Sequence, residues 1–194
     1  TASLTRNALE TAVAMITSSS KRQGVPASAT DFSTSRLKKP ETLSAQTKIM
    51  AHLPILLCKN PRDVLVICFG MGTTARSCTR YDELSVDAVE VMPDVFESFD
   101  SFHADAAWVL SLPRFHRYVQ DGRNYLLSRQ KQYDVITIDP APPLESAGTV
   151  NLYSREFFAL CKGRLKPGGL VCLWVAPTSA SEVRMIMRTF TEVF

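Results

Sequence analysis

Three acidic residues in this sequence follow short apolar runs and are candidates for a binding or catalytic site. Glu90 and Asp139 end two such runs, and Asp121 follows a third. A carboxylate can accept hydrogen bonds from both hydroxyls of a ribose or from the exocyclic amine of adenine, and it can take a proton from an attacking amine. Because an apolar run is expected to be buried and an unpaired buried carboxylate is costly, we expect Asp139 in particular to have a functional role.

Two glycines follow a fourth apolar run and mark a turn that can contact a ligand. Gly70 and Gly72 come directly after residues 63–69, with Met71 between them, and a segment that favours a helix follows. A strand, a glycine-rich turn and a helix together form a nucleotide-binding corner, in which glycine lets the backbone come close to the ligand. The partial positive charge at the start of the helix adds to this.

The combination of these residues is more specific than any of its parts. The glycine pair alone also fits a tight turn without a ligand, and Asp121-Gly122 alone fits an ordinary turn. Glu90, however, lies about eighteen residues after Gly72, close to the offset at which an acid holds the ribose in nucleotide-binding folds. The turn lacks a third glycine at the spacing expected for pyrophosphate, and the chain lacks a P-loop lysine, so we expect an adenosine-containing ligand rather than a dinucleotide.

The apolar runs and the segments between them predict an α/β fold. Strands are expected at residues 63–69, 85–91, 115–120, 134–139 and 170–175. Helices are expected at residues 44–57, 74–81, 93–102, 104–110, 123–129, 154–165 and 182–194. Strands that alternate with helices form a mostly parallel, doubly wound Rossmann-like sheet, and ligands bind beyond the carboxyl ends of its strands. The candidate residues are therefore expected to meet at one edge of the sheet.

The two ends of the chain carry weaker signals. Residues 1–45 are predicted to hold a helix, with apolar residues at helical spacing up to Ile16, and then a polar linker, while residues 46–194 form the ligand-binding domain. The chain begins with Thr1 and stops at Phe194 inside a helical pattern, so we expect a piece of a longer protein whose last strands are missing. An uncovered sheet edge would then favour either a homodimer or a less stable fragment.

Charge and composition argue against several kinds of protein. The net charge of +3, with scattered basic residues, predicts no nucleic-acid partner. Five cysteines without a Cys-x-x-Cys pair indicate free thiols in a reducing, cytoplasmic compartment, and neither disulfides nor a metal site are expected. No apolar run has the length of a membrane span, so we expect no direct membrane insertion of this segment.

From about residue 48 to residue 194, the sequence resembles the spermidine synthase-like (polyamine aminopropyltransferase) family, which has the class I S-adenosylmethionine-dependent methyltransferase fold. The matching motifs, in family order and spacing, are Ala51-His52-Leu53-Pro54, Val64 to Gly72, Val89-Glu90-Val91, Asp121 to Leu126, Tyr133 to Asp139, Leu152 to Phe158 and Leu165 to Gly169. The sequence is most similar to bacterial members that occur as soluble domains attached to membrane-spanning segments.

The resemblance implies a ligand, a reaction and roles for the candidate residues. The ligand is decarboxylated S-adenosylmethionine, S-adenosylmethionine or a related adenosyl sulfonium, held by the turn at residues 70–72, with Glu90 on the ribose and Asp121-Gly122 at the adenine. Asp139 matches the acid that orients and deprotonates the attacking amine, which then displaces the aminopropyl group from the sulfonium. The expected partner is a small-molecule amine, and the expected protein is a cytoplasmic transferase of polyamine biosynthesis.

Three positions differ from the family pattern and leave alternatives open. Met71 replaces an acid that contacts the donor's amine, Pro142 replaces a second acid that binds the polyamine, and Gln46-Thr47 replaces a Tyr-Gln pair. One alternative is a methyltransferase that uses S-adenosylmethionine itself. Another is an adenosyl-binding regulatory domain without catalytic activity. The proline-rich segment at residues 140–148 is expected to act as a lid over the ligand.

Overall fold

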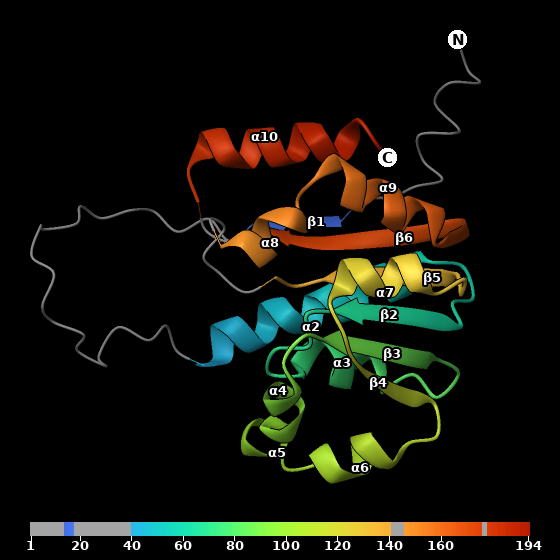
Figure 1. The fold of residues 1–194 in the computed structure, drawn as a ribbon. Coiled ribbons are helices and arrows are strands. Elements are labelled where there is room, and N and C mark those ends of the chain that lie inside the picture. The colour runs from blue at the N-terminus through green and yellow to red at the C-terminus, as the bar shows by residue number, and fades with distance from the viewer. Residues whose placement is uncertain (1–13, 18–39, 141–145, 176–177) are drawn as a thin grey trace, which may run out of the picture.

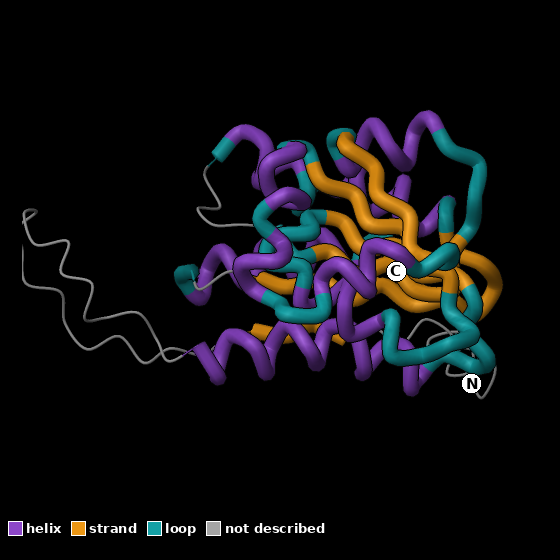
Figure 2. Tube along the Cα trace, turned by 90° about the horizontal axis from the view of Figure 1, so that it is seen from below, coloured by secondary structure: helices purple, strands orange, loops and turns teal. Residues whose placement is uncertain are grey.

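The computed structural model describes residues 14–17, 40–140, 146–175 and 178–194 of the 194-residue chain. Six parallel strands of these residues form one sheet in the order β1-β6-β5-β2-β3-β4. They are β1 (Ala14–Thr17), β2 (Asp63–Ile67), β3 (Ser85–Glu90), β4 (Phe115–Val119), β5 (Tyr133–Ile138) and β6 (Leu165–Val175). Helices cover both faces of the sheet (Figures 1 and 2). The predicted parallel, doubly wound α/β fold is confirmed.

The helices follow the predicted pattern with two differences. They are α2 (Pro40–Leu57), α3 (Thr73–Cys78), α4 (Pro93–Glu97), α5 (Phe99–Phe102), α6 (Ala106–Ser111), α7 (Gly122–Ser128), α8 (Ala147–Asn151), α9 (Arg155–Gly163) and α10 (Ala180–Thr191). The helix predicted over residues 93–102 is divided at Ser98 into α4 and α5. The short helix α8 has no counterpart among the predicted elements.

The central strand is β2, and the order of the strands reverses on its two sides. It pairs with β3 on one side and with β5 on the other, so that Ile67 lies opposite both Val89 and Ile138. The sheet continues from β3 to β4 in one direction and from β5 to β6 in the other. Such a reversal is the switch point at which doubly wound sheets bind ligands, beyond the carboxyl ends of the strands.

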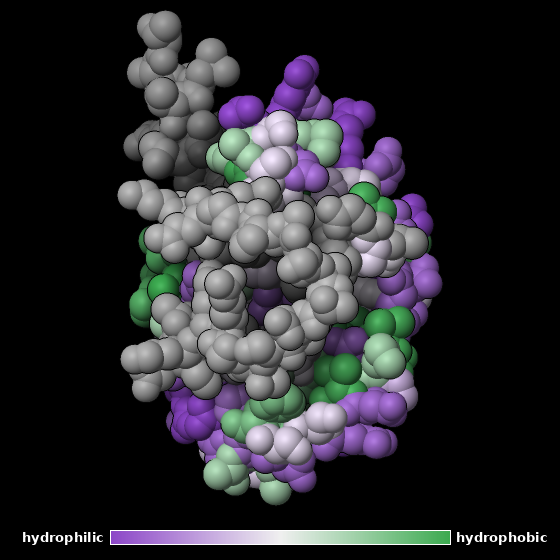
Figure 3. All heavy atoms as spheres, turned by 90° about the vertical axis from the view of Figure 1, so that its left-hand side faces the viewer, coloured by the Kyte–Doolittle hydropathy of each residue, from purple (hydrophilic) through white to green (hydrophobic). Residues whose placement is uncertain are grey.

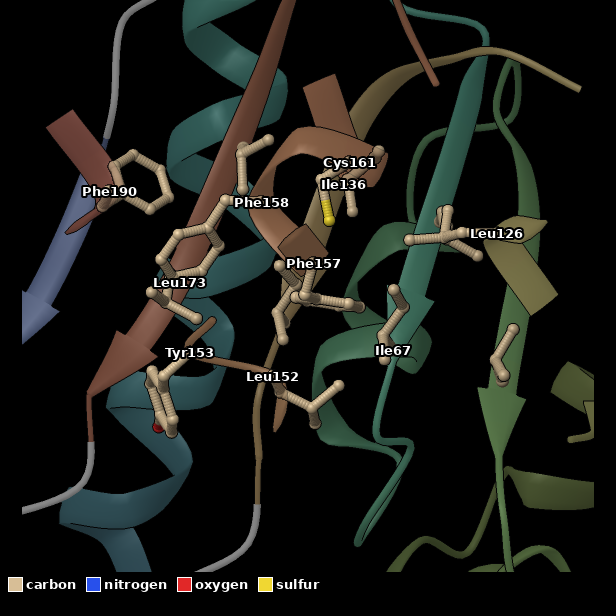
Figure 4. Packing of buried hydrophobic residues seen from close by; sticks show 14 of the residues in the cluster. Ile67, Leu126, Ile136, Leu152, Tyr153, Phe157, Phe158, Cys161, Leu173 and Phe190 are labelled. Atoms are coloured by element: carbon tan, nitrogen blue, oxygen red, sulfur yellow. The ribbon is translucent and has the colours of Figure 1, made fainter. Parts of the chain in front are cut away.

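Side chains of β2 alternate between two hydrophobic cores, one on each face of the sheet. Leu65 and Ile67 belong to a core formed with α7, α9 and α10, whereas Val64 and Val66 belong to a core formed with α2 to α6. Figure 4 shows the first core, in which Phe157 of α9 packs among side chains of the strands. A strand that is buried on both faces needs apolar residues at each position, which explains the unbroken apolar run of β2.

The N-terminal strand β1 was not predicted. Residues 14–17 pair in parallel with β6, so Ile16 lies in a strand and not in a helix. The rest of the predicted helix and the linker lie outside the described residues. Because β1 pairs with the last four residues of β6, β1 is the edge strand on this side of the sheet. The expectation of a homodimer or a less stable fragment stays a prediction. The domain boundary predicted at residue 46 falls within α2, and the division into two regions stays a prediction.

Two strands have different limits from those predicted. β2 ends at Ile67 because Cys68 has a positive φ of 67°, which takes the chain out of the extended conformation. β6 begins at Leu165, within what the sequence predicted to be a helix end and a turn, and its register with β5 is irregular between Tyr133 and Val135.

A buried carboxylate in β3 joins several elements on one face of the sheet. Asp87 accepts hydrogen bonds from the hydroxyls of Tyr125 at 3.1 Å and Tyr133 at 2.8 Å and from the Lys131 ammonium at 3.0 Å. Nδ1 of His116 lies 2.9 Å from its other oxygen. Burial raises the pKa of both tyrosines, so both remain protonated donors. Asp87 thus connects β3 to β4, α7 and β5. The sequence analysis had placed Asp87 in a strand but had given it no such role.

We expect Asp87→Ala to lower the free energy of unfolding by about 3–5 kcal/mol, because it leaves buried partners of a charged group without their acceptor. Urea denaturation followed by circular dichroism measures this loss. Glu97→Ala is the matched control, since Glu97 is exposed on α4 and its removal should change stability by less than about 0.5 kcal/mol. Equal unfolding midpoints for the two variants would contradict the structural role of Asp87.

Candidate functional site

A cleft with a volume of about 380 Å³ lies at the carboxyl edge of the sheet, where the switch point predicts it. Figure 3 views the molecule from the side toward which the strands point, where the coloured residues form both hydrophobic and hydrophilic patches. Five of the predicted site residues line the cleft, namely Gly70, Glu90, Asp121, Gly122 and Asp139. The structure therefore brings the three candidate carboxylates, from the ends of β3, β4 and β5, into one site.

Backbone amides fix the position of the Glu90 carboxylate. Its Oε1 accepts hydrogen bonds from the N–H groups of Val91 at 2.9 Å and Met92 at 3.2 Å, and its Oε2 accepts one from Gly70 at 3.4 Å. A carboxylate has about four acceptor positions, so the group keeps capacity for a ligand. The turn after β2 and the end of β3 thus hold one acid between them at the mouth of the cleft.

Asp121 caps the helix that follows β4. One of its carboxylate oxygens, Oδ1, accepts a hydrogen bond from the N–H of Asn124 at 2.9 Å, as the N-cap of α7. The next residue, Gly122, lies against β2, and a Cβ atom at this position would overlap Cγ2 of Ile67. Glycine is therefore required for the close approach of α7 to the central strand. The sequence analysis had explained the same glycine by room for an adenine ring.

The Asp139 carboxylate has no hydrogen-bond partner among the described residues, unlike those of Glu90 and Asp121. Its N–H donates to the carbonyl oxygen of Ile67 at 3.2 Å, which anchors the backbone beside β2. Burial raises the pKa of its carboxyl group to about 6. None of the described residues donates a hydrogen bond to this carboxylate. A group that is costly to ionise and has no internal partner is suited to accept a proton from a ligand.

Two of the predicted site residues do not line the cleft. Gly72 has a positive φ of 75° and precedes the first turn of α3, and a Cβ atom there would overlap the ring of Phe99. Its glycine is explained by backbone conformation and packing. Met71, which is half-buried, is also absent from the cleft wall. Of the turn at residues 70–72, only Gly70 borders the cleft.

Several cleft residues were missed by the sequence analysis. They are Cys68 and Gln120 near the ends of β2 and β4, the apolar residues Val91, Met92 and Val95, and residues Thr149 and Leu152 of the chain around α8. The start of α8 had a sequence signal, because Ser146 caps it by accepting a hydrogen bond from the N–H of Thr149 at 3.4 Å.

The lid predicted at residues 140–148 can be placed only in part. Pro140, Ser146 and Gly148 line the cleft, whereas residues 141–145, including Pro142, lie outside the described part of the chain.

Among the described residues, His, Cys, Asp and Glu side chains form no group of three or more that could hold a metal ion. The helices described here also include none with the length and hydropathy of a membrane span.

The sequence is similar to those of two kinds of enzyme that act on polyamines or putrescine by name. The chain is 29% identical over 147 residues to the polyamine aminopropyltransferase of Alkaliphilus oremlandii, a match that covers 75% of this chain and 51% of that protein. It is 32% identical over 149 residues to putrescine N-methyltransferase 2 of Nicotiana attenuata, covering 76% of this chain and 38% of that protein. The chain thus spans about half the length, or less, of the curated relatives it matches.

A solved structure shows the same fold. The crystal structure of a spermidine synthase in complex with the transition state analogue AdoDATO superposes with a TM-score of 0.68 at 24% identity, over 78% of this chain and 52% of that chain. Residues 43–189 match the Spermine/spermidine synthase domain. Because this match covers most of the sequence, the chain belongs to the spermine/spermidine synthase family.

Proposed function

We propose that this protein binds decarboxylated S-adenosylmethionine in the cleft and transfers its aminopropyl group to a small-molecule amine. The observation that carries the proposal is the half-buried Asp139 carboxylate, which has a raised pKa and lies in the same cleft as Glu90 and Asp121. Family membership supports the same reaction. Three carboxylates around one cleft also provide a negative potential that attracts a sulfonium donor and an ammonium acceptor.

The cleft has the right size and chemistry for an adenosyl ligand. Its volume of about 380 Å³ lies within the range of about 300–1,000 Å³ that is usual for small-molecule sites. In the proposed complex, Glu90 accepts hydrogen bonds from the two ribose hydroxyls, and Asp121 accepts one from the adenine amine. Val91, Met92 and Val95 supply an apolar wall beside Glu90.

Asp139 acts as the general base in this proposal. An amine is protonated at neutral pH and carries no free electron pair, so Asp139 takes a proton from the ammonium. The amine nitrogen then attacks the propyl carbon that is bonded to the sulfonium sulfur. A carbon–nitrogen bond forms, the carbon–sulfur bond breaks, and its electron pair goes to sulfur, which leaves as a neutral thioether. A base with a pKa near 6 is largely ionised at neutral pH, as this step requires.

A second candidate is methyl transfer from S-adenosylmethionine to an amine. It is favoured by Met71, which stands where the family has an acid for the donor's amine, and by the likeness to putrescine N-methyltransferases. The two reactions share the same base and the same kind of acceptor, and they differ in the donor and in which carbon of its sulfonium group faces the amine. Putrescine is therefore the first acceptor to test with both donors.

The expected setting is a reducing, cytoplasmic compartment, which the five free thiols support. A homodimer stays a prediction. The tests of the cleft depend neither on the compartment nor on the oligomeric state.

We expect Asp139→Asn to lower the rate of transfer to putrescine by about 10²–10⁴-fold, because the amide cannot accept the proton. The rate of the unchanged protein should rise with pH through about 6, the pKa of the Asp139 carboxyl group. Mass spectrometry of the products over pH 5–8 measures both effects. Asp100→Asn, on an exposed part of α5, is the control and should keep the full rate. If Asp139→Asn transfers the group as fast as this control, Asp139 is not the base.

The same variant is expected to stabilise the unliganded protein. Because the pKa of Asp139 is about 6 when folded, against 3.8 ordinarily, the folded state binds more protons between these values and its stability falls as pH rises through them. Asparagine avoids this cost, so the free energy of unfolding at pH 8 should increase by up to about 3 kcal/mol. Urea denaturation of both proteins should show this gain at pH 8 and only a small part of it at pH 4. A loss of stability at pH 8 would argue against an unpaired carboxylate.

Calorimetry with the two donors separates the candidate functions. We expect tighter binding of decarboxylated S-adenosylmethionine than of S-adenosylmethionine, because the carboxylate of the latter would add a negative charge to a cleft that already has three. The opposite preference would favour methyl transfer. Binding of a donor without transfer to any of a panel of amines would favour a regulatory domain.

A further inference from the structure

Cys68 lines the cleft directly after Ile67, the last residue of the central strand β2. Its N–H donates to the carbonyl oxygen of Val89 at 3.0 Å, and on the other side of β2 the N–H of Asp139 donates to the carbonyl oxygen of Ile67 at 3.2 Å. Cys68 is half-buried and lines the cleft. Its place is therefore between the acid that follows β5 and the acid that ends β3.

The backbone at Cys68 is in a conformation that favours glycine. Its φ is 67°, and the two neighbouring residues with positive φ, Gly70 and Gly72, are both glycines. A side chain in this left-handed region is strained, because its Cβ atom comes too close to the backbone. Cys68 is the one of these three residues that carries a side chain, and it lines the cleft. Backbone strain at a ligand site indicates that the side chain has a function there.

The surroundings of the thiol keep it neutral. Burial and then the carboxylates of Glu90, Asp139 and Asp121 raise its pKa above the ordinary range. A neutral thiol cannot attack the donor, so a covalent role is excluded at neutral pH. Cys68 instead presents a small, polarisable surface in the middle of three acids. A sulfonium sulfur carries three substituents. If the adenosyl substituent reaches Glu90 and Asp121 and another substituent reaches Asp139, the sulfur must lie between these acids, beside Cys68.

We propose that the side chain of Cys68 forms the floor beneath the sulfonium group of the donor and acts as a positioning residue that helps to select the donor. This inference rests on the proposed function, because it requires an adenosyl sulfonium in the cleft. In this proposal, the selection of the donor depends in part on Cys68, which stands at a position where the backbone favours glycine. The thiol contacts the sulfonium arm and not the adenosine part.

The test compares Cys68→Gly and Cys68→Ala with the unchanged protein. Calorimetry measures the dissociation constants of decarboxylated S-adenosylmethionine and of adenosine, which has no sulfonium arm. Both variants should bind the sulfonium donor about three- to tenfold more weakly, as for the loss of one small buried contact. Binding of adenosine should change less than about twofold. A purely structural role of Cys68 would alter both constants by the same factor and would overturn the proposal.

Thermal unfolding separates the backbone effect from the contact. Cys68→Gly should raise the melting temperature because it relieves the left-handed strain, whereas Cys68→Ala retains that strain and should not. Cys58→Ala is the matched control, since the half-buried Cys58 lies away from the cleft, with its thiol 3.7 Å from the carbonyl oxygen of Asp134 at the start of β5. It should leave the ratio of the two dissociation constants unchanged.

The proposed function and this inference fail in different ways. If the unchanged protein binds neither sulfonium donor nor adenosine, the proposed function is wrong, and the role of Cys68 is lost with it. If the unchanged protein binds the donor and both Cys68 variants bind it with the same affinity, the role of Cys68 alone is wrong.

Discussion

Burial of β2 on both faces is the constraint on which the rest of the structure depends. Its backbone groups must all find partners, and β3 and β5 supply them from the two sides. No face of the strand is free for a ligand, so only its ends can contribute to a site, and the cleft lies at the carboxyl end. The residues that bring chemistry to the cleft therefore come from the ends of this strand and of its neighbours, and backbone hydrogen bonds from Cys68 and Asp139 tie these ends together.

Two aspartates in neighbouring parts of the sheet show how partners decide the role of a carboxylate. Asp87 is almost fully buried and is surrounded by two hydroxyls, an ammonium and an imidazole, so its charge is balanced and serves the fold. Asp139 lies at a strand end beside the cleft, with its backbone anchored and its carboxylate unpartnered among the described residues. The first arrangement stabilises the protein, whereas the second leaves a carboxylate at the cleft at the expense of stability.

Much of the fold and the outline of the site could be predicted from the sequence, because buried strands need unbroken apolar runs and acids at their ends are conspicuous. Glu90, Asp121 and Asp139 were predicted this way and line one cleft. The role of Asp87 was missed because its partners are distant in sequence, and Gly122 was explained differently because its contact with Ile67 exists only in the folded state. The positive φ of Cys68 was also missed, since cysteine is not a residue that signals a left-handed turn.

The pairing of β1 with β6 has a consequence for the order in which the sheet is completed. Strands β2, β3 and β4 follow one another along the chain and lie side by side, so they can pair through local helical crossovers, with α3 between β2 and β3 and α4 to α6 between β3 and β4. The partner of Ala14 in β1, by contrast, is Cys172 in β6. During synthesis from the N-terminus, β1 must wait for β6 before the two can pair, and the segment that closes between them carries a larger entropic cost than the connections between the other described strands. This edge is therefore expected to form last.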